Sequence, residues 1–306
     1  MIVAAGLTPA YQTILVYNAV RIGEVNRAQA VYKFASGKVL NAGLALHHLG
    51  GPSTTLALVG GLEGESIERE FTALGIPHQW VWSTRATRVC TTIIDRSSGE
   101  TTELVENAAP IESSLINQFL DAFALAARHA GFAVLSGSLP AGTQKSFYRD
   151  LIGRTEARII LDASGEELRT ALAAKPFCVK PNREELGKTL GRDLTGESEL
   201  IAALREVRSL GAEWVVVSQG SRALWACGPD RIRVFHPAKV LTVNPIGSGD
   251  CLAAGVAWAL RDGMEMPEAI RFGMAAAADN AAAMLPARLD LARVRALLPQ
   301  ITSSEI

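Results

Sequence analysis

The sequence has 306 residues, 48% of them hydrophobic, and its 30 basic and 31 acidic residues give a net charge of −1. This length can bury one large core, and the balanced charge without long like-charge runs argues against a nucleic-acid-binding surface. Four scattered cysteines without C-x-x-C spacing suggest neither a zinc site nor a disulfide framework, and they suit a reducing cytoplasm. No run approaches the ~20 apolar residues of a membrane span, and the apolar start lacks the basic lead of a signal peptide.

The first 110 residues combine several strands with two helices. Runs of β-branched and aromatic residues predict strands, helical periodicity that stops at glycine predicts helices, and a polar turn at residues 96–99 predicts a hairpin. The expected strands are residues 1–7, 14–17, 30–34, 54–59, 80–82, 88–95 and 100–105, and the expected helices are residues 40–49 and 65–74.

Beyond Pro110, strands and helices alternate regularly. The expected helices are residues 113–128, 147–152, 166–173, a segment through 190 and 200–210, and the expected strands are 133–135, 158–161, 177–180, 214–217, 223–226 and 231–235, before a helical remainder to about 298. This alternation predicts an α/β fold with a mostly parallel sheet. The early strand pairs do not fit it. We therefore expect one domain, residues 1–306, with small lid strands inserted at about 12–35 and 88–106.

Polar loops follow four of the expected strands. They are residues 136–142, 180–185, 218–221 and 244–250. In a parallel sheet the carboxyl ends of the strands lie at one edge, which is where ligands bind. The four loops therefore predict a single ligand site.

The loop from Asn244 to Asp250 carries the clearest chemistry. Gly247, Ser248 and Gly249 can present backbone N–H groups at the positive end of the helix that follows, a place that binds anions. The carboxylate of Asp250 could take a proton from a hydroxyl while those N–H groups stabilise charge on a transferred phosphoryl group. The alternative interpretation is an ordinary loop in which Asp250 only caps the helix.

The chain resembles the ribokinase-like sugar kinases of the PfkB family, and within it the branch of 1-phosphofructokinase and tagatose-6-phosphate kinase. The resemblance covers essentially the whole chain and implies a three-layer α/β/α domain with a β-sheet lid. It is carried by the segments 7–11, 25–27, 36–41, 136–140, 180–186 and 244–250.

The resemblance implies roles for residues on the nucleotide side of the site. Asp250 matches the general base of the family, and Gly247, Ser248 and Gly249 match its anion hole. Asn182 and Glu185 fall on the Asn-x-x-Glu motif, which is associated with Mg²⁺ held through water. The expected ATP-binding residues are Lys180, Asn182, Ser218, Gln219, Gly220, Ser221, Arg222, Ala223 and Asn280.

On the acceptor side, the positions that match substrate-binding residues are Gln12, Gly37, Lys38, Asn41, Arg88 and Ser138. Lys38 and Arg88 are expected to hold the phosphate already on the sugar. Two positions depart from the family pattern. Gln12 stands where the branch usually has an aspartate, and Val39 replaces a glycine. These departures predict an intact phosphoryl-transfer site with an altered sugar preference.

The expected function is therefore Mg²⁺ and ATP-dependent phosphorylation of a phosphorylated ketohexose, either fructose 1-phosphate or tagatose 6-phosphate, in the cytoplasm. Neither nucleic acid nor a membrane is expected as a partner, and pairing of two lids would protect their strand edges in a homodimer. One alternative is a kinase of an unphosphorylated sugar or nucleoside. The other is a sugar or nucleotide sensor without catalysis.

Overall fold

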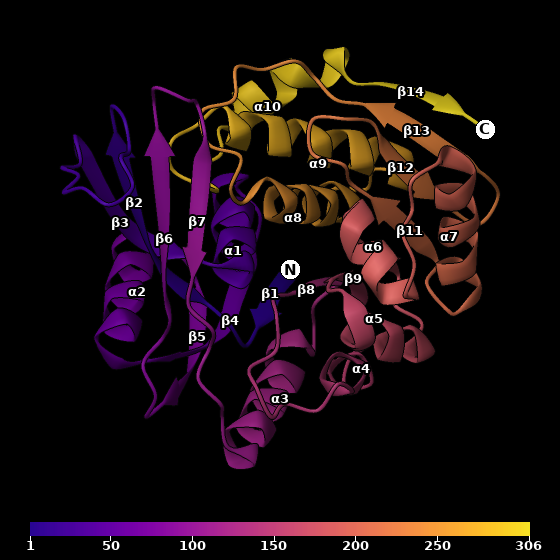
Figure 1. Cartoon of the computed structure of the whole chain (residues 1–306). Coiled ribbons are helices and arrows are strands. Elements are labelled where there is room, and N and C mark those ends of the chain that lie inside the picture. Colours follow the sequence, from indigo (N-terminus) through magenta and orange to yellow (C-terminus); the bar gives the residue numbers. More distant parts are fainter.

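The structure is a computed structural model that describes all 306 residues, and the β-rich runs of the sequence form two sheets in it (Figure 1). The larger sheet has ten strands in the order β14-β13-β12-β11-β10-β9-β8-β1-β4-β5. Its strands are β1 (Ile2–Gly6), β4 (Ser53–Gly60), β5 (His78–Ser83), β8 (Phe132–Ser136), β9 (Arg158–Asp162), β10 (Cys178–Val179), β11 (Trp214–Val217), β12 (Leu224–Cys227), β13 (Ile232–His236) and β14 (Thr302–Glu305). The strands from β5 to β11 are parallel, and β12 to β14 continue the sheet antiparallel.

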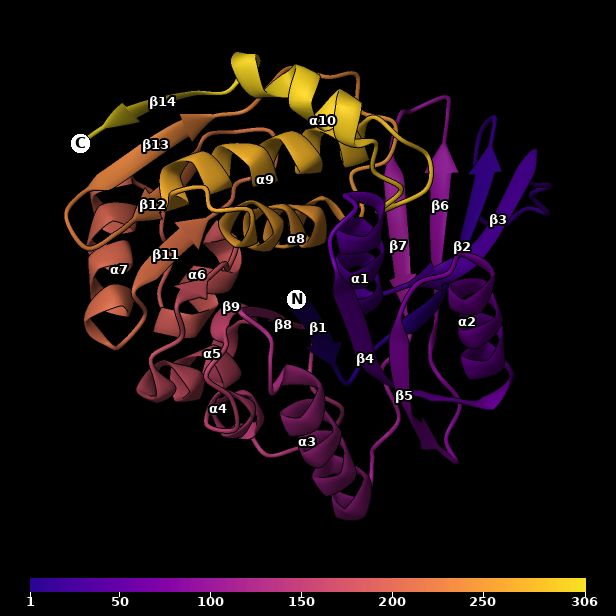
Figure 2. The ribbon, with the colours of Figure 1, turned by 180° about the vertical axis from the view of Figure 1, so that it is seen from behind.

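Helices cover both faces of this sheet, as the two opposite views in Figures 1 and 2 show. One face packs against α1 (Lys38–His48), α2 (Gly61–Ala73), α8 (Ser248–Arg261), α9 (Met266–Ala281) and α10 (Leu291–Leu297). The other packs against α3 (Ser113–Ala127), α4 (Phe147–Ile152), α5 (Gly165–Ala171), α6 (Arg183–Leu190) and α7 (Glu197–Ser209). The predicted three-layer α/β/α fold with a mostly parallel sheet is confirmed.

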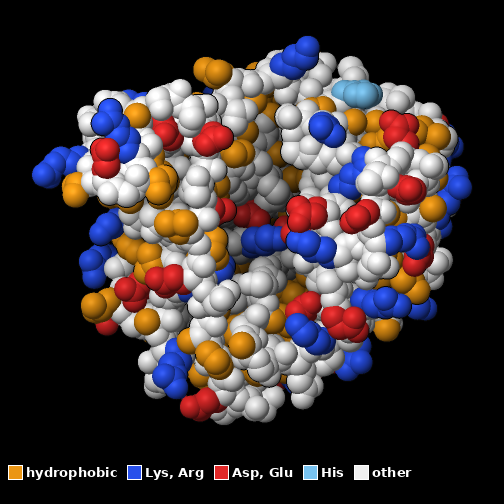
Figure 3. Space-filling view, viewed as in Figure 1, with side chains coloured by type: hydrophobic (Ala, Val, Ile, Leu, Met, Phe, Trp, Pro, Cys, Tyr) orange, Lys and Arg blue, Asp and Glu red, His pale blue; other side chains and the backbone are white.

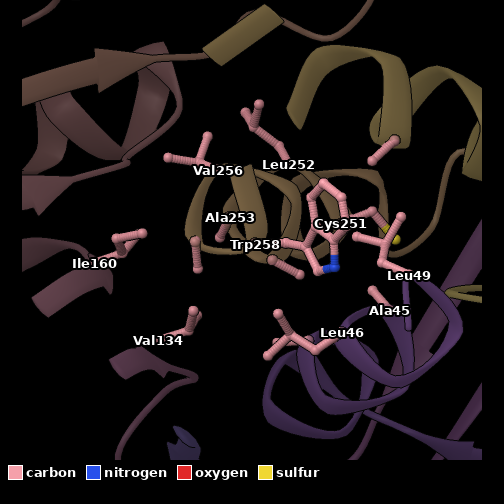
Figure 4. Close-up of a cluster of buried hydrophobic side chains, with 14 of the residues drawn as sticks. Ala45, Leu46, Leu49, Val134, Ile160, Cys251, Leu252, Ala253, Val256 and Trp258 are labelled. Atoms are coloured by element: carbon pink, nitrogen blue, oxygen red, sulfur yellow. The ribbon is translucent and has the colours of Figure 1, made fainter. Parts of the chain in front are cut away.

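Residues on the two faces of the sheet pack against the covering helices in two apolar clusters of 47 and 37 buried residues. In the larger cluster, Leu46 of α1 and Leu49, which follows that helix, lie beside Trp258 of α8, while Val134 and Ile160 project from strands of the sheet (Figure 4). Small residues let α8 and α9 approach closely: a Cβ added to Gly255 would lie 2.8 Å from the backbone of Gly273. This packing fixes α8, whose first turn carries Asp250.

The smaller sheet is the lid. It contains β2 (Ala10–Tyr17), β3 (Ala30–Ser36), β6 (Val89–Asp95) and β7 (Thr101–Val105) in the order β3-β2-β6-β7, with β2 and β6 parallel. Residues along β2 are alternately buried and half-buried, as expected for a strand with one face packed on the main body. The predicted small lid sheet is confirmed, whereas the division of the chain as one domain with inserted lid segments stays a prediction.

The sequence did not predict β14. Its sequence, Thr-Ser-Ser-Glu, is polar and exposed, so it lacks the alternation that marks a half-buried strand. It is held at the sheet edge by backbone pairing with β13 and by ion pairs of Glu305 with Arg231 and Arg233. None of the helices combines the length and apolarity that a membrane crossing requires.

Candidate active site

Polar residues gather where the central strands end. Ser136 ends β8, Asp162 ends β9, and Lys180 directly follows β10. Two further charged residues come from helices: Lys38 is the first residue of α1, and Asp250 lies in the first turn of α8. Figure 3 shows a hollow near the middle of this face, around which Lys or Arg and Asp or Glu side chains meet. Three of the four expected loops thus begin or end at this edge of the sheet, and their forming a single ligand site stays a prediction.

Asp250 lies in the first turn of α8 and its residue is 6% exposed. The Asn41 side chain donates a hydrogen bond to Asp250 Oδ2 at 2.8 Å. Asn41 is oriented in turn by the Ser36 hydroxyl, which donates to its Oδ1 at 3.1 Å. This chain of bonds fixes the carboxylate on α8 relative to the start of α1 and the lid.

Burial raises the pKa of the Asp250 carboxyl to about 7, and the neighbouring Asp162 carboxylate adds to that rise. Lys38, the bond from Asn41 and Lys180 act in the opposite direction and do not cancel it. A carboxylate that titrates near neutral pH is a much stronger base than an ordinary aspartate. Asp250 therefore has the pKa that a general base requires.

We expect kcat/KM to rise with pH through a midpoint near 7, because protonated Asp250 cannot accept the proton of an acceptor hydroxyl. Well below that midpoint the rate should fall about tenfold for each pH unit. The measurement is kcat/KM for the acceptor from pH 5.5 to 9 at saturating ATP. A profile that stays flat between pH 5.5 and 8 would contradict Asp250 as the base.

The turn before Asp250 leaves backbone N–H groups open. Gly247, the N-cap of α8, has a φ of 80°, in the left-handed region that favours glycine, and no side chain caps the helix. A Cβ added to Gly247 would lie 3.2 Å from the Asn41 amide nitrogen, and one added to Gly249 would lie 3.4 Å from Lys180 Nζ. The absence of side chains lets an anion approach the amides of this first turn.

The Asn280 side chain stabilises this turn through hydrogen bonds. Its side-chain amide donates to the Ile246 carbonyl at 2.8 Å and to the Ser248 hydroxyl at 3.0 Å, and its Oδ1 accepts the Ala287 amide. The residue is 1% exposed. Its hydrogen bonds are thus made to the loop, and the direct contact with ATP that we expected for Asn280 stays a prediction. Cys251 beside the base is a buried packing residue, and burial raises the pKa of its thiol.

A network of charges centred on the buried Asp162 lies next to Asp250. Lys38 Nζ is 3.1 Å from Asp162 Oδ1 and 3.4 Å from Glu185 Oε1, and Lys180 Nζ is 3.2 Å from Asp162 Oδ2. The Asp162 side chain is only 2% exposed. Burial alone would raise the pKa of Asp162, but the two ammonium groups outweigh it and hold that pKa below its usual value. Asp162, chiefly, raises the pKa of Lys38, so both partners are charged.

Sequence reasoning missed Asp162. The signal was available, because Asp162 directly follows the predicted strand 158–161 at the edge where the other polar residues lie. The network also shows that Lys38, which we expected to hold the sugar phosphate, is directed to two carboxylates in the structure. Its ammonium group is within reach of the same edge, so its role toward a phosphate stays a prediction.

Asn182 and Glu185 form the capping box of α6. The Asn182 side chain accepts the Glu185 amide, and Glu185 Oε2 accepts the Asn182 amide, both at 2.8 Å. No three acidic, cysteine or histidine side chains converge to form a metal cage. Glu185 keeps acceptor capacity on both oxygens, which fits a water of a hydrated Mg²⁺ carried by a nucleotide and does not fit direct coordination by a protein cage.

On the acceptor side, Arg88 lies at the base of the lid. Its guanidinium donates to the carbonyls of Thr8, Pro9 and Glu106 at 3.3–3.4 Å. It lines a hollow with Thr8, Pro140 and Arg85. The Thr8 hydroxyl donates to the Ser138 carbonyl at 2.8 Å, and Gly37 packs against the backbone of residues 8–10. Gln12 lies on β2 of the lid with its side chain bonded to Thr92.

The loop from Ser218 to Ala223 connects β11 to β12 beside the start of α6. A backbone bridge joins Asn182 to Ser218, and the Gln219 side chain accepts from Arg183 Nη1 at 3.0 Å. Gln219 in turn donates to the Ala223 carbonyl. Gly220, Ser221 and Arg222 are exposed at the tip of the loop. The predicted nucleotide loop is thus adjacent to the Asn-x-x-Glu helix.

Arg183, which we did not predict as a site residue, ties this loop to the next one. Besides Gln219, it donates to the carbonyls of Leu194 at 2.5 Å and Gly196 at 2.7 Å. We expect Arg183→Ala to raise KM for ATP about five- to thirtyfold while KM for the acceptor stays unchanged, because about 1–2 kcal/mol of loop-ordering bonds are lost. The measurement is initial-rate kinetics, with Arg169→Ala, an exposed arginine of α5, as control. Equal effects on both Michaelis constants would contradict this prediction.

A buried carboxylate beside an uncapped helix N-terminus, at the carboxyl edge of a parallel α/β sheet, is an arrangement suited to phosphoryl transfer. The sequence model of the pfkB family of carbohydrate kinases matches residues 1–283. The chain therefore belongs to the pfkB family of carbohydrate kinases, which use ATP as co-substrate.

Solved structures agree with this assignment. Phosphofructokinase-2 from Escherichia coli, solved in complex with potassium, is 26% identical over 97% of this chain and 98% of its own, with a TM-score of 0.89. The same enzyme in complex with substrates and products is 26% identical over the same shares, with a TM-score of 0.90. A protein of Thermotoga maritima described as a possible 1-phosphofructokinase shares the fold, with 20% identity over 100% of this chain and 99% of its own and a TM-score of 0.91.

Proposed function

We propose that this carbohydrate kinase transfers the γ-phosphoryl group of ATP to a hydroxyl of a phosphorylated ketohexose, fructose 1-phosphate or tagatose 6-phosphate, giving a bisphosphate. The observation that carries the transfer step is Asp250, a buried carboxylate whose pKa is raised to about 7 beside the open N-terminus of α8. Asp250 removes the proton of the acceptor hydroxyl as that oxygen attacks the phosphorus. Of the three expected anion-hole residues, Ser248 already donates its amide to the Pro245 carbonyl at 3.2 Å. The amides of Gly247 and Gly249, together with that of Asp250, stabilise the charge on the transferred group.

The remaining residues act on binding and orientation. Lys180 and Lys38, both paired with Asp162, place positive charge beside the anion turn. Glu185 is the group that would hold a water of the Mg²⁺ bound to the nucleotide, and Mg²⁺ supplies neutralisation of the phosphate oxygens when present. The loop from Ser218 to Ala223 takes the nucleotide. The lid excludes water, which would otherwise compete as acceptor.

Arg88 and Arg85 support a phosphorylated acceptor. Both line the hollow at the base of the lid, and Arg85 forms no ion pair or side-chain hydrogen bond of its own. Two guanidinium groups beside one hollow suit a phosphate dianion. Phosphofructokinase-2 of Escherichia coli has been solved in complex with fructose-6-phosphate, which makes a phosphosugar a reasonable acceptor class for this relative too.

We expect Arg88→Ala to raise KM for the phosphosugar about 10- to 100-fold, because charge-assisted hydrogen bonds of about 1.5–3 kcal/mol are lost. An unphosphorylated sugar carries no phosphate for Arg88 to bind. Its weak turnover should therefore be the same in Arg88→Ala as in the wild type. Steady-state kinetics on both acceptors test this, with Arg96→Ala, an exposed arginine after β6, as control. If both acceptors lost turnover equally, Arg88 would only be holding the lid backbone.

We further propose a cytoplasmic homodimer formed through the lid. The outer strands β3 and β7 have unpaired edges, and Val31, Leu104 and Val105 are each more than half exposed there. Exposed apolar edge strands favour pairing with another chain. The four cysteines are all free and buried, which suits a reducing compartment. Sedimentation equilibrium of the wild type and of a Leu104→Lys variant tests the dimer.

A further inference from the structure

Gln12 and Thr92 form a buried polar pair in an apolar part of the lid. Gln12 is 2% exposed and Thr92 is fully buried. Gln12 Nε2 donates to Thr92 Oγ1 at 2.7 Å, and this is the one hydrogen bond of the Gln12 side chain within the protein. Around the pair, Ile14, Val16 and Phe34 form an apolar cluster.

The pair lies on the face of the lid that turns toward Asp250. Residues alternate between the two faces of a strand, so Gln12 shares its face with Ala10. Ala10 pairs with Ser36, the residue whose hydroxyl orients Asn41 and through it Asp250. Thr92 pairs with Ile14 across the β2 and β6 ladder, and so it lies on this face as well.

The bond to Thr92 leaves one end of the Gln12 amide free. Because Nε2 is directed at Thr92, Oε1 points the other way. No protein group donates to Oε1, and Oε1 is not among the polar atoms sealed in the interior without a partner. An otherwise buried side chain thus offers a single accessible acceptor atom beside the catalytic network. Oε1 therefore keeps acceptor capacity that no protein group uses, and a hydroxyl of a bound molecule can complete this bond.

We propose that Thr92 is a positioning residue that fixes the amide of Gln12 so that its Oε1 accepts a hydrogen bond from a hydroxyl of the acceptor sugar. The proposal rests on the proposed kinase function and adds a determinant of acceptor specificity. Gln12 Oε1 accepts the hydrogen bond that one sugar hydroxyl donates, and the neutral amide adds no negative charge near Asp250. A carboxylate at position 12 would instead accept from Thr92, reverse the direction of that bond and add such a charge.

The test compares three variants of β6. Thr92→Val keeps the shape and removes the acceptor of the Gln12 amide. Thr92→Ser keeps the hydroxyl and should behave like the wild type. Thr91→Val makes the same change on the opposite face of the same strand, where Thr91 pairs with Thr13, and is the matched control.

Steady-state kinetics should show that Thr92→Val raises KM for the phosphosugar about tenfold, the effect expected for one uncharged hydrogen bond, with KM for ATP unchanged. Acceptor analogues that each lack one hydroxyl identify its partner. In the wild type, kcat/KM for one analogue should be about tenfold lower than for the complete sugar. In Thr92→Val, kcat/KM for that analogue and for the complete sugar should be equal. Equal KM values for Thr92→Val and Thr91→Val, or the same analogue preference in Thr92→Val as in the wild type, would overturn the proposal.

Failure of the kinase function itself gives a different result, because the wild type would then transfer phosphate to no sugar. The proposal would still be decided by NMR of the Gln12 side-chain amide. In the wild type and in Thr92→Ser, fructose 1-phosphate or tagatose 6-phosphate should shift this resonance, and one amide proton should exchange slowly. In Thr92→Val the slow exchange should be lost. A Gln12 amide that exchanges fast in the wild type would contradict the fixed orientation.

Discussion

Asp250→Asn is expected to lower kcat by about 10²- to 10⁴-fold, the range in which a general base contributes. The amide is nearly isosteric, so the bond with Asn41 can be kept while the base is lost. KM values should change little because Asp250 acts on the proton in the transition state. Asn at this position should also make the protein more stable at pH 8, since burial disfavours the charged form of Asp250 and raises its pKa to about 7.

The measurement is the initial rate of ADP release at saturating substrates, together with urea unfolding at pH 6 and pH 8. Asp193→Asn, which changes an exposed aspartate in the same way, serves as control. If Asp250→Asn retained more than about a tenth of wild-type kcat, Asp250 would not be the base. The interpretation of this residue as a simple helix cap would then be the better one.

Asp162→Asn is expected to have a large effect on stability. It leaves Lys38 and Lys180 without the buried carboxylate that both contact, and breaking a buried pair by removing one partner costs roughly 3–5 kcal/mol. The pKa of Asp162 is held below its usual value, so its contribution is present at neutral pH and is lost as the pH falls through that pKa. The destabilisation should therefore be largest at pH 7 and smaller near pH 3.

The same substitution should move the pH profile of catalysis. Asp162 is, after burial, the main cause of the raised pKa of Asp250. Removing its negative charge leaves the two ammonium groups acting on Asp250, so the midpoint of kcat/KM should shift from near 7 to lower pH. Urea unfolding and the pH profile of the variant test both effects. A normal stability with an unchanged midpoint would show that the network does not control the base.

The sequence predicted the fold well where the patterns were strong. The regular alternation beyond Pro110 gave the parallel sheet and its crossover helices, and the two misfitting strand pairs gave the lid. The last strand was missed because Thr302–Glu305 is polar and held at the edge by backbone pairing and by arginines of β13 and its preceding turn. Such a strand depends on its neighbours in space and has no periodic signal of its own.

The sequence predicted the residues of the site better than their contacts. The segment from Asn244 to Asp250 indicated an anion turn with a base, because glycines before a helix and a first-turn aspartate are local features. The pairing of Lys38 with Asp162 joins residues 124 positions apart, and the bond from Asn41 to Asp250 joins residues 209 apart. Spacing within a motif does not show such contacts, so Lys38 was associated with the sugar phosphate alone and Asp162 was not recognised.

The pair of Gln12 and Thr92 shows the same limit. Gln12 was visible in the sequence as a departure from the family pattern, but the sequence did not reveal its partner, 80 positions away on a neighbouring strand. The structure supplies the direction of the amide. The direction of this amide leads to the hypothesis that Gln12, which replaces the usual aspartate, accepts a hydrogen bond from a hydroxyl of the acceptor sugar.

The central claim is tested most directly by ADP release from Mg²⁺-ATP with a panel of acceptors: fructose 1-phosphate, fructose 6-phosphate, tagatose 6-phosphate, fructose, ribose and nucleosides. We predict turnover with fructose 1-phosphate or tagatose 6-phosphate well above turnover with every unphosphorylated acceptor, and its loss in Asp250→Asn. Turnover confined to unphosphorylated sugars or nucleosides would contradict the roles of Arg88 and Arg85. No turnover with any acceptor would contradict the kinase function and favour a sensor.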